Sequence, residues 1–94
     1  MIISGLIWLN DIVEKINKKH HVRIEEVIEV LKSHPKFRYV EKGHRKGENV
    51  YSAMGQTNTG RYLMVIFIFK QNCHALILTA RDMTNSERRG YENR

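Results

Sequence analysis

The chain has 94 residues, of which 16 are Lys or Arg and 10 are Asp or Glu, so its formal charge is +6. This length allows one domain, residues 1–94, with a modest hydrophobic core, and it excludes a separate cofactor-binding domain. The longest apolar run, residues 62–69, is too short to span a membrane, and the N-terminus lacks the basic start of a signal peptide, so we expect a cytoplasmic protein. The excess of cations favours an anionic partner such as nucleic acid or an acidic protein, although a merely soluble basic surface would carry the same charge.

The first elements are predicted from hydrophobic spacing and from helix-end signals. An apolar strand is expected over residues 2–9. Asp11 and Glu14 have the spacing of a capping box, so a helix is expected to start there. Apolar residues recur at helical spacing over residues 24–31, which predicts a second helix. Pro35 ends this helix, because the residue before a proline disfavours the helical conformation.

Beyond this proline the hydrophobic pattern changes to a period of two, which is typical of strands separated by short turns. Residues 62–69 are apolar at both alternating positions, so we expect a central strand that is covered on both faces. Thr84 and Glu87 have capping-box spacing and predict a short C-terminal helix. The expected strands are residues 37–40, 50–54, 62–69 and 74–80.

The predicted order of elements is therefore β-α-α-β-β-β-β-α. Consecutive strands that are joined by short turns pair antiparallel, and helices must cover an apolar sheet face. The sequence predicts an α+β fold with an antiparallel four- or five-stranded sheet packed with helices.

Metal and cofactor chemistry is not indicated by the sequence. The five histidines show no zinc-binding spacing, and the single Cys73 excludes an internal disulfide. The chain contains neither a phosphate-binding glycine loop nor a Gly-x-Ser-x-Gly elbow. We expect no metal and no cofactor.

The remaining candidates are basic and aromatic side chains that suit RNA cleavage without a metal. RNA supplies its own nucleophile, the 2′-hydroxyl, so a protein needs groups that move a proton and groups that stabilise charge on phosphorus. Histidine suits the first task, the arginine fork suits the second, and exposed aromatic rings stack on unpaired bases. The candidates are Trp8, Lys19, His20, His44, Arg45, Arg61, Arg81, Arg88, Arg89 and Tyr91.

Each candidate also has a structural explanation. Trp8 could fill the core, His20 could stabilise a helix C-terminus, and the last arginines could form a solvated helix face. Arg81 is the most suggestive candidate. It follows an apolar strand directly and has the same alternation as Ala75, Ile77 and Thr79, which places a cation at the end of the sheet.

Residues 77–92, I-L-T-A-R-D-M-T-N-S-E-R-R-G-Y-E, resemble the signature of the BrnT family, an I-I-S-A-R stretch followed by T-x-x-E-R-x-x-Y-E. The similarity extends over nearly the whole chain, and this C-terminal block is its most specific part. The other matching positions are Trp8, Lys19, His20, Val22, Glu25–Val30, Gly55 and Gly60–Leu63.

The resemblance implies a RelE-like microbial ribonuclease fold and a toxin that cleaves RNA without a metal and inhibits translation. It also implies neutralisation by a BrnA-type ribbon-helix-helix antitoxin, through which the complex binds operator DNA. By the same resemblance Arg81 and Arg88 would hold the scissile phosphate, and Lys19 or His20 would assist with charge or proton transfer. Tyr91 completes the catalytic candidates. The RNA-binding candidates are Trp8, His44, Arg45, Arg61 and Arg89.

Three positions depart from the family pattern. Leu9 replaces the usual Asp after the tryptophan, and His21 replaces a Gly. Val50 stands where a strand arginine is expected, for which Arg45 or Arg61 could substitute. These departures keep two other functions open: a catalytically degenerate relative that acts by antitoxin binding and autoregulation, and a non-enzymatic RNA- or DNA-binding module.

Overall fold

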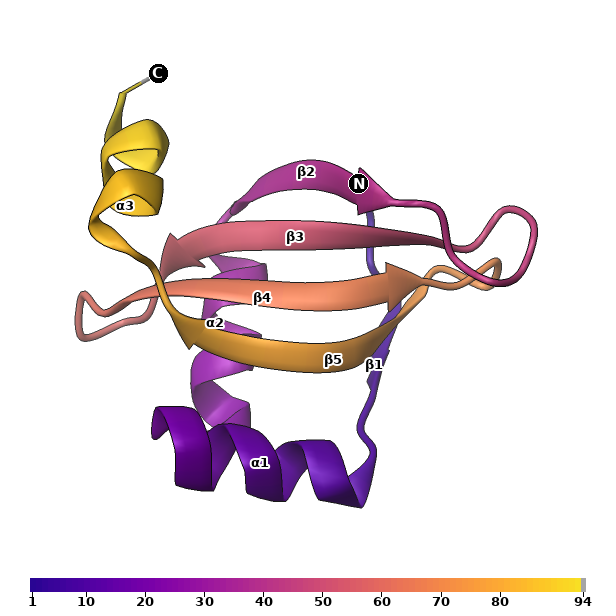
Figure 1. Ribbon diagram of the computed structural model, residues 1–94, viewed down its shortest axis with the longest axis horizontal. Coiled ribbons are helices and arrows are strands. Elements are labelled where there is room, and N and C mark those ends of the chain that lie inside the picture. The colour runs from indigo at the N-terminus through magenta and orange to yellow at the C-terminus, as the bar shows by residue number, and fades with distance from the viewer. Residues whose placement is uncertain (94) are drawn as a thin grey trace.

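Helices and strands follow one another in the predicted order in the computed structural model, which describes residues 1–93 (Figure 1). Arg94, one of the C-terminal cations, lies outside the described residues. Within residues 1–93, no helix is long and apolar enough to cross a membrane. The elements are β1 (Gly5–Ile7), α1 (Asn10–His20), α2 (Ile24–Lys32), β2 (Lys36–Glu41), β3 (Asn49–Gln56), β4 (Tyr62–Phe69), β5 (His74–Asp82) and α3 (Asn85–Glu92).

All five strands join one sheet in the order β1-β5-β4-β3-β2. The hairpins β2–β3, β3–β4 and β4–β5 are antiparallel, because a short turn reverses the direction of the chain. β1 pairs parallel with β5, so the sheet is mixed, and the prediction of a purely antiparallel sheet is wrong. No turn joins β1 to β5, and the two helices that follow β1 leave its direction relative to β5 unconstrained.

The first strand is shorter than predicted. Only Gly5–Ile7 of the expected segment 2–9 pairs with β5. The ring of His74 packs over Gly5 at this point, since a Cβ at Gly5 would lie 2.8 Å from that ring. A glycine at this position therefore leaves room for the His74 side chain beside the parallel pairing.

The start of α1 also differs from the prediction. α1 begins at Asn10 with Leu9 in the N-cap position, and an apolar side chain cannot accept a hydrogen bond from the first turn. The predicted capping box at Asp11 is therefore wrong, and Asp11 instead lies in the first turn, where its charge is favourable to the helix dipole. The end of α2 at Lys32 agrees with the stop signal at Pro35.

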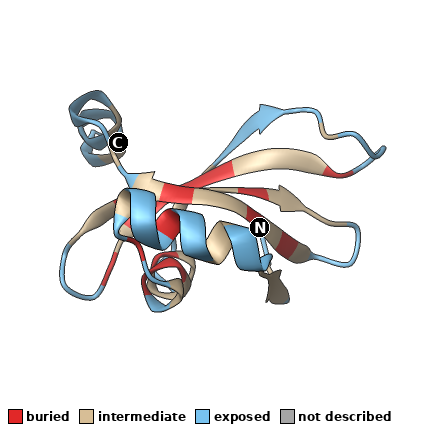
Figure 2. Ribbon diagram, turned by 60° about the horizontal axis from the view of Figure 1, so that its bottom comes forward, coloured by how far each residue is buried: buried red, intermediate tan, exposed pale blue. Residues whose placement is uncertain are grey.

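Helices α1 and α2 cover one face of the sheet. Ile16 of α1 and Val27 of α2 belong to the same fully buried cluster as Val65 and Phe67 of β4. The Phe67 ring packs edge-on against Phe37, with 6.1 Å between ring centroids. Figure 2 shows the buried segments in the middle of the strands and the exposed outer side of α1. The hydrophobic core lies between this sheet face and the two helices.

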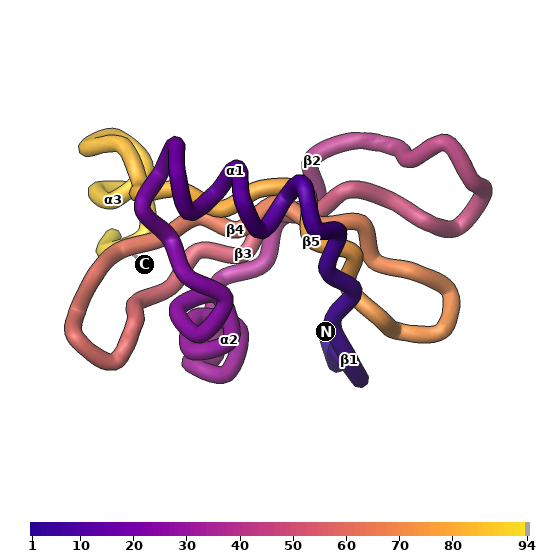
Figure 3. The backbone as a smooth tube through the Cα atoms, turned by 90° about the horizontal axis from the view of Figure 1, so that it is seen from below, coloured from indigo at the N-terminus to yellow at the C-terminus, as the bar shows by residue number. Residues whose placement is uncertain are grey.

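The opposite face of the sheet, called the open face below, carries only α3 at one end. Figure 3 shows α2 and α3 on opposite sides of the strands. The prediction that residues 62–69 are covered on both faces therefore holds at Met64, which is buried on the open face, and fails at Ile66 and Ile68, which remain partly exposed there. A strand that is apolar at both alternating positions does not by itself indicate whether helices of the same chain cover both faces of the sheet.

A bulge in β5 decides which face its last residues occupy. Ile66 of β4 pairs with Thr79 and the next residue, Phe67, pairs with Ile77, so Leu78 is an extra residue in β5. Alternation is reset at this point. Ile77 faces the helices, whereas Arg81 lies opposite Met64 on the open face. For this reason the expectation that Arg81 shares a face with Ala75 and Ile77 is wrong, whereas Thr79, which was expected on the same face, does lie on the open face with Arg81.

Arg61, in the turn before β4, joins the end of α1 and the start of α2 to the sheet. Its Nε and Nη2 donate to the carboxylate of Asp82 at 2.7 and 3.1 Å. Its Nη atoms also donate to the carbonyl oxygens of His20 and His21 at 2.8 and 2.7 Å, and Nη1 donates to buried Glu26 at 3.2 Å. One guanidinium thus satisfies carbonyl groups at the C-terminus of α1 and a buried carboxylate of α2.

We expect Arg61→Ala to lower the free energy of unfolding by about 2–4 kcal/mol, because it leaves the buried carboxylate of Glu26 and two helix-end carbonyls without this partner. Urea unfolding measures this change. Arg89→Ala, at an exposed arginine, is the control and should change stability by less than about 0.5 kcal/mol. Equal stability of the two variants would contradict a structural role for Arg61.

Candidate functional site

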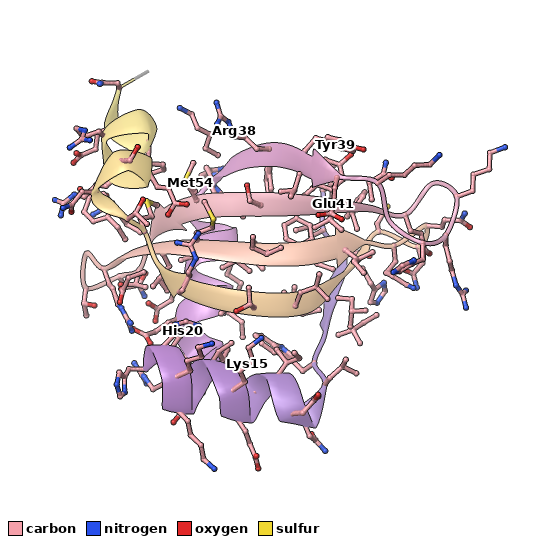
Figure 4. All side chains as sticks on the ribbon, viewed as in Figure 1. Lys15, His20, Arg38, Tyr39, Glu41 and Met54 are labelled. Carbon is pink, nitrogen blue, oxygen red and sulfur yellow. The ribbon has the colours of Figure 1, made fainter. Side chains whose placement is uncertain are left out.

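A groove of about 500 Å³ lies on the open face of the sheet, between β2 and α3. Its floor is formed by alternate residues of β3 and β4, which is why one small polar and three apolar side chains lie together there. Figure 4 shows Met54 of the floor and Arg38 of β2 beside α3. The floor residues are Ser52, Met54, Met64 and Ile66, and the surrounding residues are Lys36, Arg38, Tyr39, Val40, Ser86, Glu87 and Gly90.

Helix α3 forms one wall of this groove and is positioned by polar contacts. Its predicted capping box is confirmed: Glu87 N donates to Thr84 Oγ1 at 3.1 Å, and Thr84 N donates to Glu87 Oε1 at 2.9 Å. Lys36 Nζ of β2 donates to the carbonyl of Gly90 at 3.4 Å, across the groove. Each of the eight residues Asn85–Glu92 remains at least partly exposed.

Tyr62 at the start of β4 contacts three further side chains of α3. The guanidinium of Arg88 lies 3.9 Å from the centre of the Tyr62 ring, and Tyr91 packs edge-on against the same ring with 6.0 Å between centroids. The Tyr62 hydroxyl donates to Glu92 Oε2 at 3.0 Å. Two catalytic candidates, Arg88 and Tyr91, therefore meet on one aromatic ring at the end of the sheet.

Arg81 forms a bidentate ion pair with Glu87. Its Nη1 and Nη2 donate to Glu87 Oε1 and Oε2 at 2.7 and 2.9 Å. Hydrogen bonding to Arg81 is the largest cause that lowers the pKa of Glu87 to about 2, and hydrogen bonding to Glu87 raises the pKa of Arg81. Glu87 is therefore a carboxylate at neutral pH, and its low pKa makes it a poor general base.

Lys19 and His20 lie in the last turn of α1, at the same end of β5 as Arg81. The carbonyl of His20 binds Arg61, which binds Asp82, the neighbour of Arg81 in β5. Figure 4 shows His20 on the side of α1 that faces β5. Asp82 pairs with core residue Leu63 and therefore faces the helices. Because His20 is linked to Asp82 through Arg61, His20 lies on the side of β5 opposite to the open face.

Two RNA-binding candidates lie far from this end of the sheet. His44 and Arg45 belong to the loop between β2 and β3, at the end opposite α3 (Figure 1). β3 has eight residues, so the loop lies roughly 25 Å away along the strand direction. Val50 lies near the same end, opposite Ile68. The structure thus does not bring the His44–Arg45 pair to Arg81.

Trp8 lies on the helix side of the sheet rather than on the open face. It packs against the core and lines a second, apolar groove with Leu6, Leu31 and Phe37. Arg89, in contrast, is exposed on α3. Contact of Trp8 with RNA stays a prediction, and its present neighbours are hydrophobic side chains of β1, α2 and β2.

The family model described as "Ribonuclease toxin, BrnT, of type II toxin-antitoxin system" matches residues 10–87. The chain belongs to the BrnT family. This BrnT family is one of ribonuclease toxins, and its type II toxin–antitoxin system implies an antitoxin partner. No curated protein matches the chain. The match contains Lys19, His20, Arg81 and Glu87, whereas Trp8, Arg88, Arg89 and Tyr91 lie outside the matched residues.

The groove residues of this BrnT chain were not predicted from the sequence. Lys36 and Arg38 are two residues apart on edge strand β2, so their side chains lie on the same face. This pattern was the sequence signal that could have indicated a cationic groove wall. Glu87 was assigned only a capping role, because its pairing with Arg81 depends on the bulge at Leu78. Among residues 1–93, no cluster of three or more His, Cys, Asp or Glu side chains could hold a metal ion.

We expect stability to fall as pH is lowered. The folded-state pKa of Glu87 is about 2 against an ordinary value of 4.5, so its contribution is complete above pH 4.5 and disappears as pH falls towards 2. Because the ion pair is partly exposed, this contribution is about 1 kcal/mol. Urea unfolding of the wild type and Glu87→Gln over this pH range measures it. A fall of the same size in both proteins would contradict the assignment.

Proposed function

We propose that this protein is a metal-independent endoribonuclease toxin that binds single-stranded RNA in the groove on the open face of the sheet. The observation that carries the proposal is the position of Arg81 at the end of a groove with an apolar floor and cationic residues along β2, in a chain of a ribonuclease-toxin family. Apolar and cationic surfaces side by side suit a base and a phosphate of an unpaired strand.

Cleavage would proceed by attack of the RNA 2′-oxygen on the adjacent phosphorus. The 2′-hydroxyl proton leaves, the P–O5′ bond breaks, and the 5′-oxygen takes up a proton, which gives a 2′,3′-cyclic phosphate and a 5′-hydroxyl end. Arg81 and Arg88 would stabilise the charge on the phosphorane. Lys19 or His20, at the same end of β5 but on its helix side, would assist with proton transfer or charge across the edge of β5, which β1 leaves unpaired at Arg81. Tyr91 would position Arg88 through their shared contacts with Tyr62.

The remaining candidates would contact RNA beyond the cleavage point. Arg89 is exposed on α3 next to Arg88, and His44 and Arg45 lie in the exposed loop at the other end of the groove face. Met54 and Met64 would contact a base on the groove floor. Arg61 and Trp8 would act by holding α1 and β1 in place, with RNA contact as their second predicted role.

The cellular part of the proposal follows from the family. A BrnA-type ribbon-helix-helix antitoxin would neutralise the toxin in the cytoplasm and carry the complex to operator DNA, and free toxin would inhibit translation by cutting RNA. We also infer a RelE-like architecture formed by a single domain over residues 1–94. A catalytically degenerate, antitoxin-binding relative is the second candidate function, favoured by Val50 and by the occupied guanidinium of Arg81.

We expect the purified protein to cut a long single-stranded RNA in excess EDTA and to leave 2′,3′-cyclic phosphate ends. Arg81→Ala should reduce the rate by about 10²-fold or more, the scale of a lost charge-stabilising donor. Gel analysis with end-group determination measures both results.

Two controls accompany this experiment. Lys18→Ala removes an exposed cation of α1 and should cut RNA at the wild-type rate. Circular dichroism of Arg81→Ala tests whether the protein stays folded, since Arg81 also contacts α3. Cleavage by Arg81→Ala at the wild-type rate would refute its role, and no cleavage by the wild type would favour the degenerate relative.

A further inference from the structure

The guanidinium of Arg81 is already occupied within the protein. Nη1 donates to Glu87 Oε1 at 2.7 Å and to the carbonyl of Asp82 at 3.0 Å. Nη2 donates to Glu87 Oε2 at 2.9 Å and contacts Met64 Sδ at 3.4 Å. Both terminal nitrogens thus use their donors on protein atoms. A phosphate can use the fork that Nη1 and Nη2 form only where the carboxylate of Glu87 leaves it.

Glu87 lines the groove and holds both terminal nitrogens of Arg81. The Arg81 side chain itself keeps about a third of its surface exposed and contacts Met64 of the groove floor. Lys36 and Arg38 lie along β2 on the opposite wall. A phosphodiester that is attracted into the groove by these two cations therefore finds the terminal nitrogens of Arg81 already paired with the carboxylate of Glu87.

We propose that Glu87 is an internal competitor for the RNA phosphate: its carboxylate fills the fork of Arg81 in the free protein, and bound RNA replaces it. This inference rests on the proposed function, because it assigns a phosphodiester of single-stranded RNA as the incoming anion. Carboxylate and phosphate both present two oxygens that match the guanidinium fork, so one can take the place of the other.

The local structure allows this exchange without loss of α3. The bond from Glu87 N to Thr84 Oγ1 uses the backbone of Glu87 and persists when the side chain turns away. Displacement gives up the ion pair with Arg81 and the bond from Thr84 N to Glu87 Oε1. Both are partly exposed contacts, which water and ions can replace at low cost. The carboxylate of Glu87 therefore competes weakly with RNA for Arg81, and this competition is called the gate below.

Glu87→Gln tests this gate. Gln keeps the capping box but removes the charge that pairs with Arg81. We expect this variant to bind a short single-stranded 2′-O-methyl RNA, which cannot be cleaved, about three- to tenfold more tightly than the wild type in fluorescence anisotropy. Glu41→Gln removes an exposed carboxylate of β2 that lies away from Arg81 and Arg88, and it reports the general effect of charge on RNA binding. Its gain should be clearly smaller.

A double-mutant cycle separates competition from a purely structural contact. If Glu87 competes with RNA, the gain from Glu87→Gln disappears in the Arg81→Ala background. An equal gain in both backgrounds, or weaker binding by a Glu87→Gln protein that circular dichroism shows to be folded, would overturn the proposal. Cleavage by the wild type without a gain from Glu87→Gln would overturn the gate alone. A gain in binding without any cleavage would overturn the ribonuclease and keep the gate.

Discussion

The extra residue Leu78 in β5 sets the arrangement on which both sides of the sheet depend. It resets the alternation of the strand and so decides that Arg81 points to the open face and Asp82 to the helix face. Asp82 binds Arg61 and thereby holds the end of α1 and the start of α2 against the sheet. Arg81 faces the groove side and binds Glu87 of α3. Without the bulge, these two residues would exchange faces, and neither pair could form as it does.

The two arginine–carboxylate junctions therefore have different physical characters. Arg61 closes a junction that includes a buried carboxylate and two helix-end carbonyls, so opening it exposes several groups that need partners. Arg81 and Glu87 join the sheet to a helix without a buried residue, and their contact faces a groove with cations on its other wall. The first junction suits a structural role, and the second suits exchange with an anionic ligand.

Much of the fold was predictable from the sequence, because local signals determine it. Apolar spacing and Pro35 predicted α2, and the spacing of Thr84 and Glu87 predicted the capping box of α3. The parallel direction of β1 and the bulge at Leu78 depend on pairing between distant segments, which alternation within one strand does not reveal. The groove escaped prediction for the same reason, since three strands and α3 build it together.

The central claim, that RNA binds on the open face, is tested most directly by NMR of methyl-labelled methionine. The chain has four methionines, of which Met54 and Met64 form the groove floor and Met1 lines the apolar groove on the helix side. Addition of single-stranded 2′-O-methyl RNA should shift the methyl resonances of Met54 and Met64 and leave Met1 unchanged. A shift of Met1 with unchanged Met54 and Met64 would place the RNA on the helix side and contradict the account.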